Sequence, residues 1–263
     1  MHAICCACGT QFVESPAPPP RCPICEDERQ FVRWGGQAWT DLDRLRRSHA
    51  LDIALDHGVL GLGITPHFGI GQRALLVESP AGNVLWDCVS LINKAGERAI
   101  AERGGLAAIA ISHPHYYTSM VDWSRAFGYV PIYLHAEDRA WVQWPDPAIV
   151  FWDGDTREIL PGLTLIRCGG HFAGATVLHK AGGTGELFVG DVLQVGQDRR
   201  SVSFMYSYPN LIPLNAAAVQ RIRDALAPFA FDRVHGAFRE RSIAEGGRPA
   251  FERSVERYLR AIA

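Results

Sequence analysis

The chain has 263 residues, 48% of them hydrophobic, and its 28 acidic and 26 basic residues leave a net charge of −2. This length suits one sizeable domain with a small appendage, and the mixed charge excludes the strongly basic surface typical of nucleic-acid or anionic-membrane binding. No apolar run is long enough to span a bilayer, and cysteines stand where the apolar core of a secretory leader would lie, so we expect a cytoplasmic protein without a membrane partner.

Residues 1–36 hold two pairs of cysteines that predict a small metal-binding module. The pairs are Cys5 with Cys8 and Cys22 with Cys25, and a proline-rich loop separates them. Two C-x-x-C pairs are typical of a tetrahedral zinc site with four cysteine ligands, and metal binding would supply the folding free energy that so short a segment lacks. The pattern also resembles a rubredoxin-like module, which binds iron, so both metals stay open. Cys6 is expected to point away from this zinc-ribbon-like site.

Residues 37–71 are interpreted as a linker and edge segment. A capping-box-like start at Thr40 and Asp43 predicts one helix before position 57. The glycine-rich stretch 58–71 that follows is expected to loop over the edge of the domain. The main domain is therefore expected to occupy residues 72–263.

Apolar strands and helices alternate along the main domain, which is typical of a layered α/β protein. Glycine or proline turns bound most of the expected elements. Strands are expected at 73–78, 84–88, 106–111, 131–135, 149–152, 158–168, 176–180, 186–189 and 231–234. Helices are expected at 91–103, 121–127, around 138–142, at 214–227 and at 249–262.

Two histidines follow the buried strand that ends at Ile111. His113 and His115 flank Pro114, and extended chain with this spacing places both imidazoles on one side of the strand end. Two rings held side by side suit one metal ion. The alternative is a pair of hydrogen-bonded loop histidines.

Three further residues of metal-ligand type follow strands and stand beside glycines. They are His171, Asp191 and His235. Glycine lets the chain turn sharply at these places, and strand ends are where open-sheet sites usually form. Each of the three, taken alone, is also explained as a core or loop residue, and for a single histidine that explanation is favoured. The repeated order of strand, glycine and ligand nevertheless favours one shared site.

The order of these residues resembles the metallo-β-lactamase fold superfamily. His113-Pro114-His115 resembles the first half of its H-x-H-x-D-H motif, and the later matches are Gly170-His171 with Gly174 for its G-H-x-x-G segment, Gly190-Asp191 for its metal-bridging aspartate and His235 for its last histidine. The resemblance covers about residues 72–235. It implies a four-layer αββα sandwich, an α+β arrangement within the α/β class, and metal-dependent hydrolysis. A smaller group of such proteins is also similar at Cys22–Arg29 and Ser112–Tyr117.

The chain departs from this family pattern where the second metal is held. Tyr117 and Thr118 replace the aspartate and histidine of the motif. Threonine is a poor zinc ligand, and a tyrosine would have to ionise from a pKa near 10. We therefore expect a mononuclear centre with one zinc-like ion. Its expected ligands are His113, His115, His171 and, as a fourth, Asp191.

The hydrolase hypothesis assigns roles to these residues. Metal-activated water is expected to attack the carbonyl of a small-molecule ester, thioester or amide, while Asp191 ligates the ion or orients the water. Tyr116, Tyr117 or His235 would donate a hydrogen bond to the developing oxyanion. The alternatives are that Tyr117 only packs in the vacant second site and that His235 is an ordinary loop histidine.

Two other functions fit the same sequence. In the first, the sandwich is a catalytically inactive scaffold with a structural zinc, and the four-cysteine module docks a partner. In the second, the module holds iron and transfers electrons. A count of metal ions per chain discriminates the first from a hydrolase, and the red colour of ferric iron on four thiolates discriminates the second. Homo-oligomer formation stays open.

Overall fold

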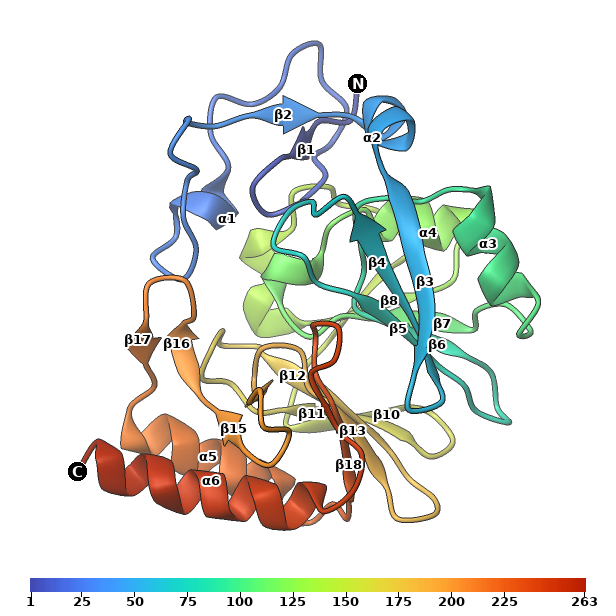
Figure 1. Ribbon diagram of the computed structural model, residues 1–263. Helices are drawn as coiled ribbons and strands as arrows, with labels where there is room; N and C mark the ends of the chain where they lie inside the picture. The colour runs from blue at the N-terminus through green and yellow to red at the C-terminus, as the bar shows by residue number, and fades with distance from the viewer.

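The computed structural model describes the whole chain, Met1–Ala263. Two sheets pack face to face, and helices cover the outer face of each (Figure 1). This four-layer αββα sandwich is the architecture that the sequence resemblance implied. A small N-terminal module sits at one end of the sandwich and is coloured blue in Figure 1.

The first sheet has seven strands, which follow one another in chain order across the sheet. They are β3 (Ala50–Asp56), β4 (Val59–Thr65), β5 (Ala74–Val77), β6 (Val84–Trp86), β7 (Ala108–Ala110), β8 (Ile132–His135) and β9 (Ile149–Trp152). Neighbours from β3 to β6 pair antiparallel, and neighbours from β6 to β9 pair parallel. Helices α3 (Lys94–Ala101) and α4 (Met120–Ala126) cover its outer face, where Ile100 and Trp123 pack on the strands.

The second sheet has six strands, in the order β10-β11-β12-β13-β18-β19. They are β10 (Thr156–Leu160), β11 (Leu163–Arg167), β12 (Thr176–Lys180), β13 (Glu186–Phe188), β18 (Arg233–His235) and β19 (Ser242–Ile243). Only β13 and β18 pair parallel. Helices α5 (Ala216–Leu226) and α6 (Gly247–Ala261) cover its outer face with Ile222, Phe251 and neighbouring apolar side chains.

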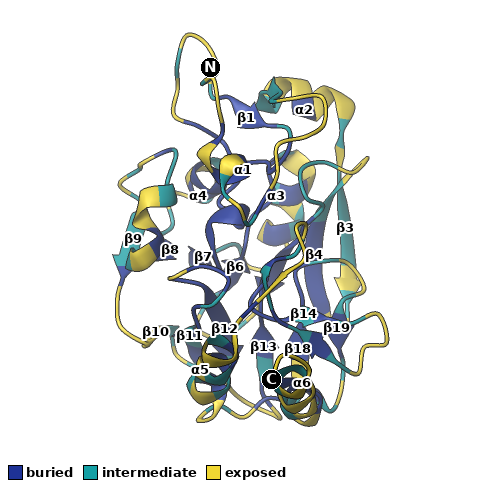
Figure 2. Cartoon of the chain, turned by 90° about the vertical axis from the view of Figure 1, so that its left-hand side faces the viewer, coloured by how far each residue is buried: buried dark blue, intermediate teal, exposed yellow.

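Side-chain alternation along the strands builds the core between the two sheets. Val84 and Trp86 of β6 point to the second sheet, where they join Leu165 and Phe188, while Leu85 between them points to the helices. This is the period of two that a strand buried on both faces requires. Figure 2 shows the result: the central strands are mostly buried, and α5 and α6 expose their outer faces.

The first sheet begins earlier than the sequence predicted, so the expected loop at 58–71 and the domain start at 72 are corrected. β3 and β4, of seven residues each, form a hairpin in that region. The hairpin turns at His57 and Gly58, which both have positive φ, as a tight two-residue turn of this kind requires. The signal was weak because β3 is a half-exposed edge strand and glycines interrupt β4. The helix before it, α2 (Leu42–Ser48), is capped by Asp41 rather than Thr40.

Two smaller differences concern strand limits. The expected strand 158–168 is divided into β10 and β11, because Gly162 turns the chain with φ +80°. The expected strand 231–234 is shifted to Arg233–His235, and this shift matters for the site below. Short paired strands occur at β14 (Gln194–Val195), β15 (Val202–Ser203), β16 (Met205–Ser207) and β17 (Ile212–Pro213), and 3-10 turns at Pro114–Tyr116 and Ala136–Trp141.

The N-terminal module has little regular structure of its own. It contains β1 (Ile4–Cys5), which pairs with β2 (Trp39–Thr40), and the single turn α1 (Pro23–Glu26). Hydrogen bonds dock it on the loop after β6 and on α4: Ser90 Oγ donates to the Gly9 carbonyl at 2.8 Å, and Gln11 Nε2 donates to Asp122 Oδ2 at 2.8 Å. On the other side, the β16–β17 hairpin reaches towards α1 (Figure 1).

Candidate metal centres and the adjoining pocket

The four cysteines of the two C-x-x-C pairs come together in the N-terminal module. All four side chains are buried, and their sulfur atoms lie within 4.8 Å of one another. Cys5 Sγ lies 3.5 Å from Cys25 Sγ, and Cys8 Sγ lies 3.7 Å from Cys22 Sγ. These separations far exceed a disulfide bond and approach the edge of about 3.8 Å of a tetrahedron with metal–sulfur bonds of about 2.3 Å. The module therefore fits the predicted four-cysteine metal site, and Cys6 lies outside it.

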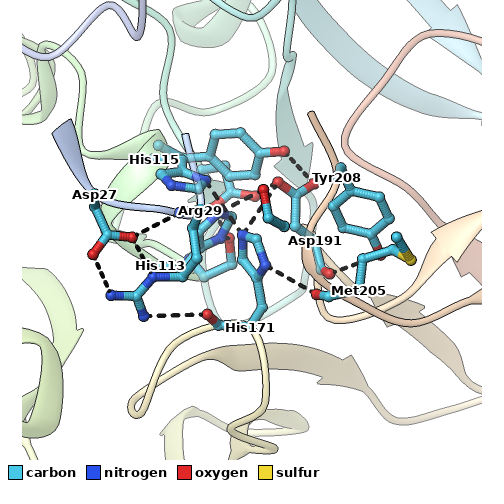
Figure 3. A network of polar contacts seen from close by, with 12 residues as sticks. Asp27, Arg29, His113, His115, His171, Asp191, Met205 and Tyr208 are labelled. Atoms are coloured by element: carbon cyan, nitrogen blue, oxygen red, sulfur yellow. Dashed lines mark hydrogen bonds and ion pairs between the residues drawn. The ribbon is translucent and has the colours of Figure 1, made fainter. Parts of the chain in front are cut away.

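A second cluster lies where loops from the two sheets meet (Figure 3). His113 and His115 follow β7, His171 lies between β11 and β12, and Asp191 follows β13. All four side chains are buried, and their ligand atoms lie within 4.8 Å of one another. The structure thus brings together the four residues that the strand ends predicted as ligands.

The spacing of these atoms fits a metal ion. His171 Nε2 lies 3.3 Å from His115 Nδ1, and Asp191 Oδ2 lies 3.4 Å from His113 Nε2 and 3.8 Å from His171 Nε2. A tetrahedron with metal–nitrogen bonds of about 2.0–2.1 Å has edges of about 3.4 Å. His113 Nε2 is buried without a hydrogen-bond partner. Such an atom lowers the stability of the fold unless a bound group, such as a metal ion, satisfies it. The donor set suits zinc or a similar divalent ion.

Hydrogen bonds behind the cluster orient its ligands. Ser112 Oγ donates to Asp87 Oδ1 at 2.8 Å and lies 2.8 Å from His113 Nδ1, so Nδ1–H donates to Ser112 and the lone pair of Nε2 faces the centre. Tyr116 Oη donates to Asp191 Oδ1 at 2.6 Å, which leaves Oδ2 for the centre. The His171 ring lies with Nδ1 3.2 Å from the Met205 carbonyl oxygen. Such outer contacts fix the tautomer and angle of metal ligands.

Comparison with known proteins places the chain among relatives. No family model matches it. It is 43% identical over 267 aligned positions to the uncharacterized protein YmaE of Bacillus subtilis (strain 168), and the alignment covers 99% of this chain and 97% of YmaE. The chain belongs to the YmaE family.

Solved structures establish the fold of this YmaE-family protein. TMB-1 is similar with a TM-score of 0.60 and 15% identity, over 81% of this chain and 98% of TMB-1. The metallo-β-lactamase FIM-1 from Pseudomonas aeruginosa, in its mono-zinc form, is similar with a TM-score of 0.55 and 17% identity, over 80% of this chain and 96% of FIM-1. The protein therefore has the metallo-β-lactamase fold. None of its helices combines the length and apolarity needed to cross a membrane.

Burial and contacts within the cluster set the charges of its side chains in this YmaE-family protein. It lowers the pKa of His115 to about 4, and burial together with the neighbouring His113 and His115 holds the pKa of His171 well below its usual range. Burial opposes the charge of Asp191, but its contacts with His113 and His115 outweigh this and hold its pKa well below the usual range. Neutral imidazoles and a carboxylate are the forms that bind a metal.

Tyr117, predicted as a catalytic residue, lies in the core instead. Its ring packs among the residues between the first sheet and α4, and its hydroxyl faces the Asp138 carbonyl oxygen at 3.4 Å. This is the packing alternative. The neighbouring Tyr116 is the tyrosine that reaches Asp191.

His235, the other predicted catalytic residue, is also corrected. It lies within β18 opposite Phe188, its Nε2 is 2.9 Å from Glu186 Oε2, and its ring stacks on Phe188. The strand is shifted relative to the prediction, so His235 is inside it rather than after it. Phe238, three residues further along in the turn before β19, is an apolar residue that lines the pocket beside the cluster.

A cavity of about 320 Å³ opens beside the cluster and has a wall that the sequence did not reveal. His115, His171 and Asp191 form its inner end, and Arg29 and Gln30 of the N-terminal module line one side. The similarity noted at Cys22–Arg29 was the signal for this segment, but its position depends on how the module docks. A larger groove, of about 930 Å³ between α5 and β11, contains no residue of either metal cluster.

Proposed function

We propose that this protein is a metal-dependent hydrolase that holds one catalytic ion at His113, His115 and His171 and cleaves a small ester, thioester or amide. The observation that carries the proposal is the convergence of three imidazoles and the Asp191 carboxylate, from loops of both sheets, at the inner end of a cavity. A divalent ion held there supplies Lewis acidity and lowers the pKa of water to about 7.

The protein's own groups would position the reactants. Asp191 keeps Oδ2 free because Tyr116 occupies Oδ1, so Oδ2 is available to ligate the ion or to accept a hydrogen bond from the attacking water. The Ser112 and Asp87 contacts hold His113 in one orientation. The cavity leaves room for a small acyl group on the open side of the cluster.

Three features support a single catalytic ion. Tyr117 and Thr118 stand where the family motif has ligands for a second metal, and Tyr117 is packed in the core. His235, the last histidine of the family pattern, lies 2.9 Å from Glu186 and is not part of the cluster. FIM-1, which has the same fold, exists in a mono-zinc form. For the four-cysteine site we propose a structural zinc, and iron is the other metal that four thiolates accept.

Metal analysis of matched variants tests the proposal. Wild-type protein is expected to carry close to two metal ions per chain, Cys22→Ser to lose the module's ion, and His115→Ala to lose the ion in the pocket together with hydrolysis of an uncharged ester such as p-nitrophenyl butyrate. His57→Ala is the control, because His57 lies in the β3–β4 turn outside the cluster. A wild-type protein with a single ion, lost only in Cys22→Ser, would contradict a hydrolase and favour a scaffold.

A further inference from the structure

The cavity beside the histidine cluster is small and mostly uncharged. Its volume of about 320 Å³ is at the lower end for ligand pockets, which run from about 300 to 1,000 Å³. Apart from the cluster, its lining is mostly apolar side chains and neutral hydrogen-bonding groups. The apolar ones include Phe31, Ile70 and Phe238, and the neutral polar ones are Gln30, Gln194 and Tyr208. The ionisable side chains outside the cluster are His67 and Arg29.

Arg29 is the single lysine or arginine among the residues that line this cavity. It comes from the N-terminal module, four positions after Cys25. Its guanidinium stacks on Phe172, 3.8 Å from the ring centroid, and Nη1 donates to the His171 carbonyl oxygen at 3.3 Å. Arg29 is therefore fixed directly beside a residue of the cluster, as Figure 3 shows.

Asp27 neutralises this guanidinium. Its two carboxylate oxygens accept from Nε at 2.5 Å and from Nη2 at 2.9 Å, and Oδ1 also accepts from the Arg29 backbone N–H at 3.0 Å. Both side chains are largely buried: 13% of the Arg29 side chain and 15% of the Asp27 side chain are exposed. A bidentate pair of this kind is geometrically specific and is screened little by solvent.

The pair changes which substrates the cavity attracts. An unpaired guanidinium in a cavity of low dielectric would attract a carboxylate strongly. With Asp27 bound to it, the Arg29 wall presents a dipole instead of a net positive charge, whereas Asp191 would offset part of the charge of an ion held at the cluster. A carboxylate lying against this wall, away from the cluster, would give up its hydration without finding a free cation there.

Resting on the proposed function, we infer that the pocket takes small acyl substrates that carry no charge on the part lying against Arg29, and that Asp27 determines this specificity by neutralising Arg29. The apolar side chains Phe31, Ile70 and Phe238 then contact the hydrocarbon part of the substrate. The module that carries the four-cysteine site thus also supplies the wall that selects substrates.

Two matched pairs of probes test this inference on the full-length, metal-loaded protein. The reactive pair is p-nitrophenyl butyrate and the mono-p-nitrophenyl ester of succinic acid, which differ by a terminal carboxylate, and kcat/KM is measured for each. The unreactive pair is butyramide and succinamate, whose binding is measured by calorimetry. The wild type is expected to favour the uncharged member of each pair by about tenfold or more.

Asp27→Asn is the decisive variant, because asparagine keeps an oxygen for the Arg29 backbone and removes the charge. It should shift both ratios towards the carboxylate by about tenfold or more. Glu28→Gln is the matched control, because it removes the charge of the neighbouring carboxylate. That carboxylate accepts a hydrogen bond from Tyr206 Oη at 2.6 Å and makes no contact with the guanidinium. Should Asp27→Asn fail to fold, Arg29→Gln tests the same pair with the opposite sign, since it leaves Asp27 unpaired and should strengthen the preference for uncharged probes.

The outcomes separate this inference from the proposed function. Equal or tighter binding of succinamate by the wild type, or identical ratios for Asp27→Asn and Glu28→Gln, would overturn the specificity. Charge discrimination in binding without hydrolysis of either ester would support the specificity and contradict the hydrolase. Hydrolysis of both esters without discrimination would support the hydrolase and overturn the specificity.

Discussion

The four-cysteine cluster and the histidine–aspartate cluster are both buried sets of four ligands, but they are built in different ways. The cysteines come from two short segments within the first 25 residues and form their own small core. The histidines and Asp191 come from loops of two sheets, and 78 positions separate His113 from Asp191. The first cluster is enclosed by its own module, whereas the second adjoins a cavity. A closed site stabilises a fold, and a site with an open side can do chemistry.

The two regions meet along the short segment that follows Cys25. Tyr206 Oη donates to Glu28, and Asn210 Nδ2 donates to the carbonyl oxygens of Glu28 and Gln30. These contacts tie the segment to the β16–β17 hairpin of the main domain. The closed cluster therefore holds one wall of the open one, and the comparison can be tested by disturbing each cluster alone.

The largest effect is expected from Cys22→Ser. Structural zinc contributes about 10–16 kcal/mol of folding free energy in isolated zinc-finger peptides, and the module has only a small apolar core to replace it. We expect its first 40 residues to become sensitive to limited proteolysis and the first thermal transition to fall, while the sandwich keeps its own core. Cys6→Ser is the control, since Cys6 lies beside the cluster without belonging to it. Equal protease resistance of the two variants would show that the module folds without its metal.

Sequence patterns predicted the parts of this molecule that depend on local spacing. The C-x-x-C pairs identified all four cysteines. Before any contact was known, the spacing at one strand end identified His113 and His115, and strand ends beside glycine identified His171 and Asp191. The alternating apolar strands also predicted the layered fold. In each case the deciding signal lies within a few residues along the chain.

The features that were missed depend on register or on docking. His235 was misplaced because β18 ends one residue later than predicted, which makes His235 the last residue of the strand, opposite Phe188, instead of the first residue after it. The wall formed by Arg29 depends on contacts such as Ser90 with Gly9, which are 81 positions apart. The β3–β4 hairpin was missed because its outer strand is half-exposed and lacks a clear apolar period.

A smaller effect distinguishes Tyr116 from Tyr117, the two tyrosines that follow His115. Tyr116→Phe removes the hydrogen bond of 2.6 Å to Asp191 Oδ1 and should weaken metal binding in the pocket by about 10–100-fold, the usual effect of losing an outer contact. Tyr117→Phe removes only a contact of 3.4 Å with a carbonyl oxygen and should leave the affinity unchanged. Competition with a chelator measures both affinities. If Tyr117→Phe had the larger effect, the assignment of Tyr116 as the partner of Asp191 would be wrong.

The smallest effect concerns His235, which sequence placed in the site and the structure places on Glu186. The hydrogen bond from His235 lowers the pKa of Glu186 to about 2, below its value of about 4.3 in unfolded chains. The folded protein therefore gains stability from the carboxylate above about pH 4.3, and this gain is lost as the pH falls towards 2. Glu186→Gln should lower the free energy of unfolding by about 1–3 kcal/mol at pH 7, and the difference from the wild type should shrink below pH 4.

Urea denaturation of the wild type and Glu186→Gln across this pH range measures the difference in their free energies of unfolding. Any loss of metal at low pH affects the two proteins alike and cancels in this difference. The pocket should keep its ion in Glu186→Gln at neutral pH, because neither Glu186 nor His235 belongs to the cluster. If Glu186→Gln lost that ion and its hydrolysis while its stability stayed unchanged, His235 and Glu186 would have to be assigned to the histidine–aspartate site after all. Its bond to Glu186 and its stacking on Phe188 instead indicate a residue that stabilises the second sheet.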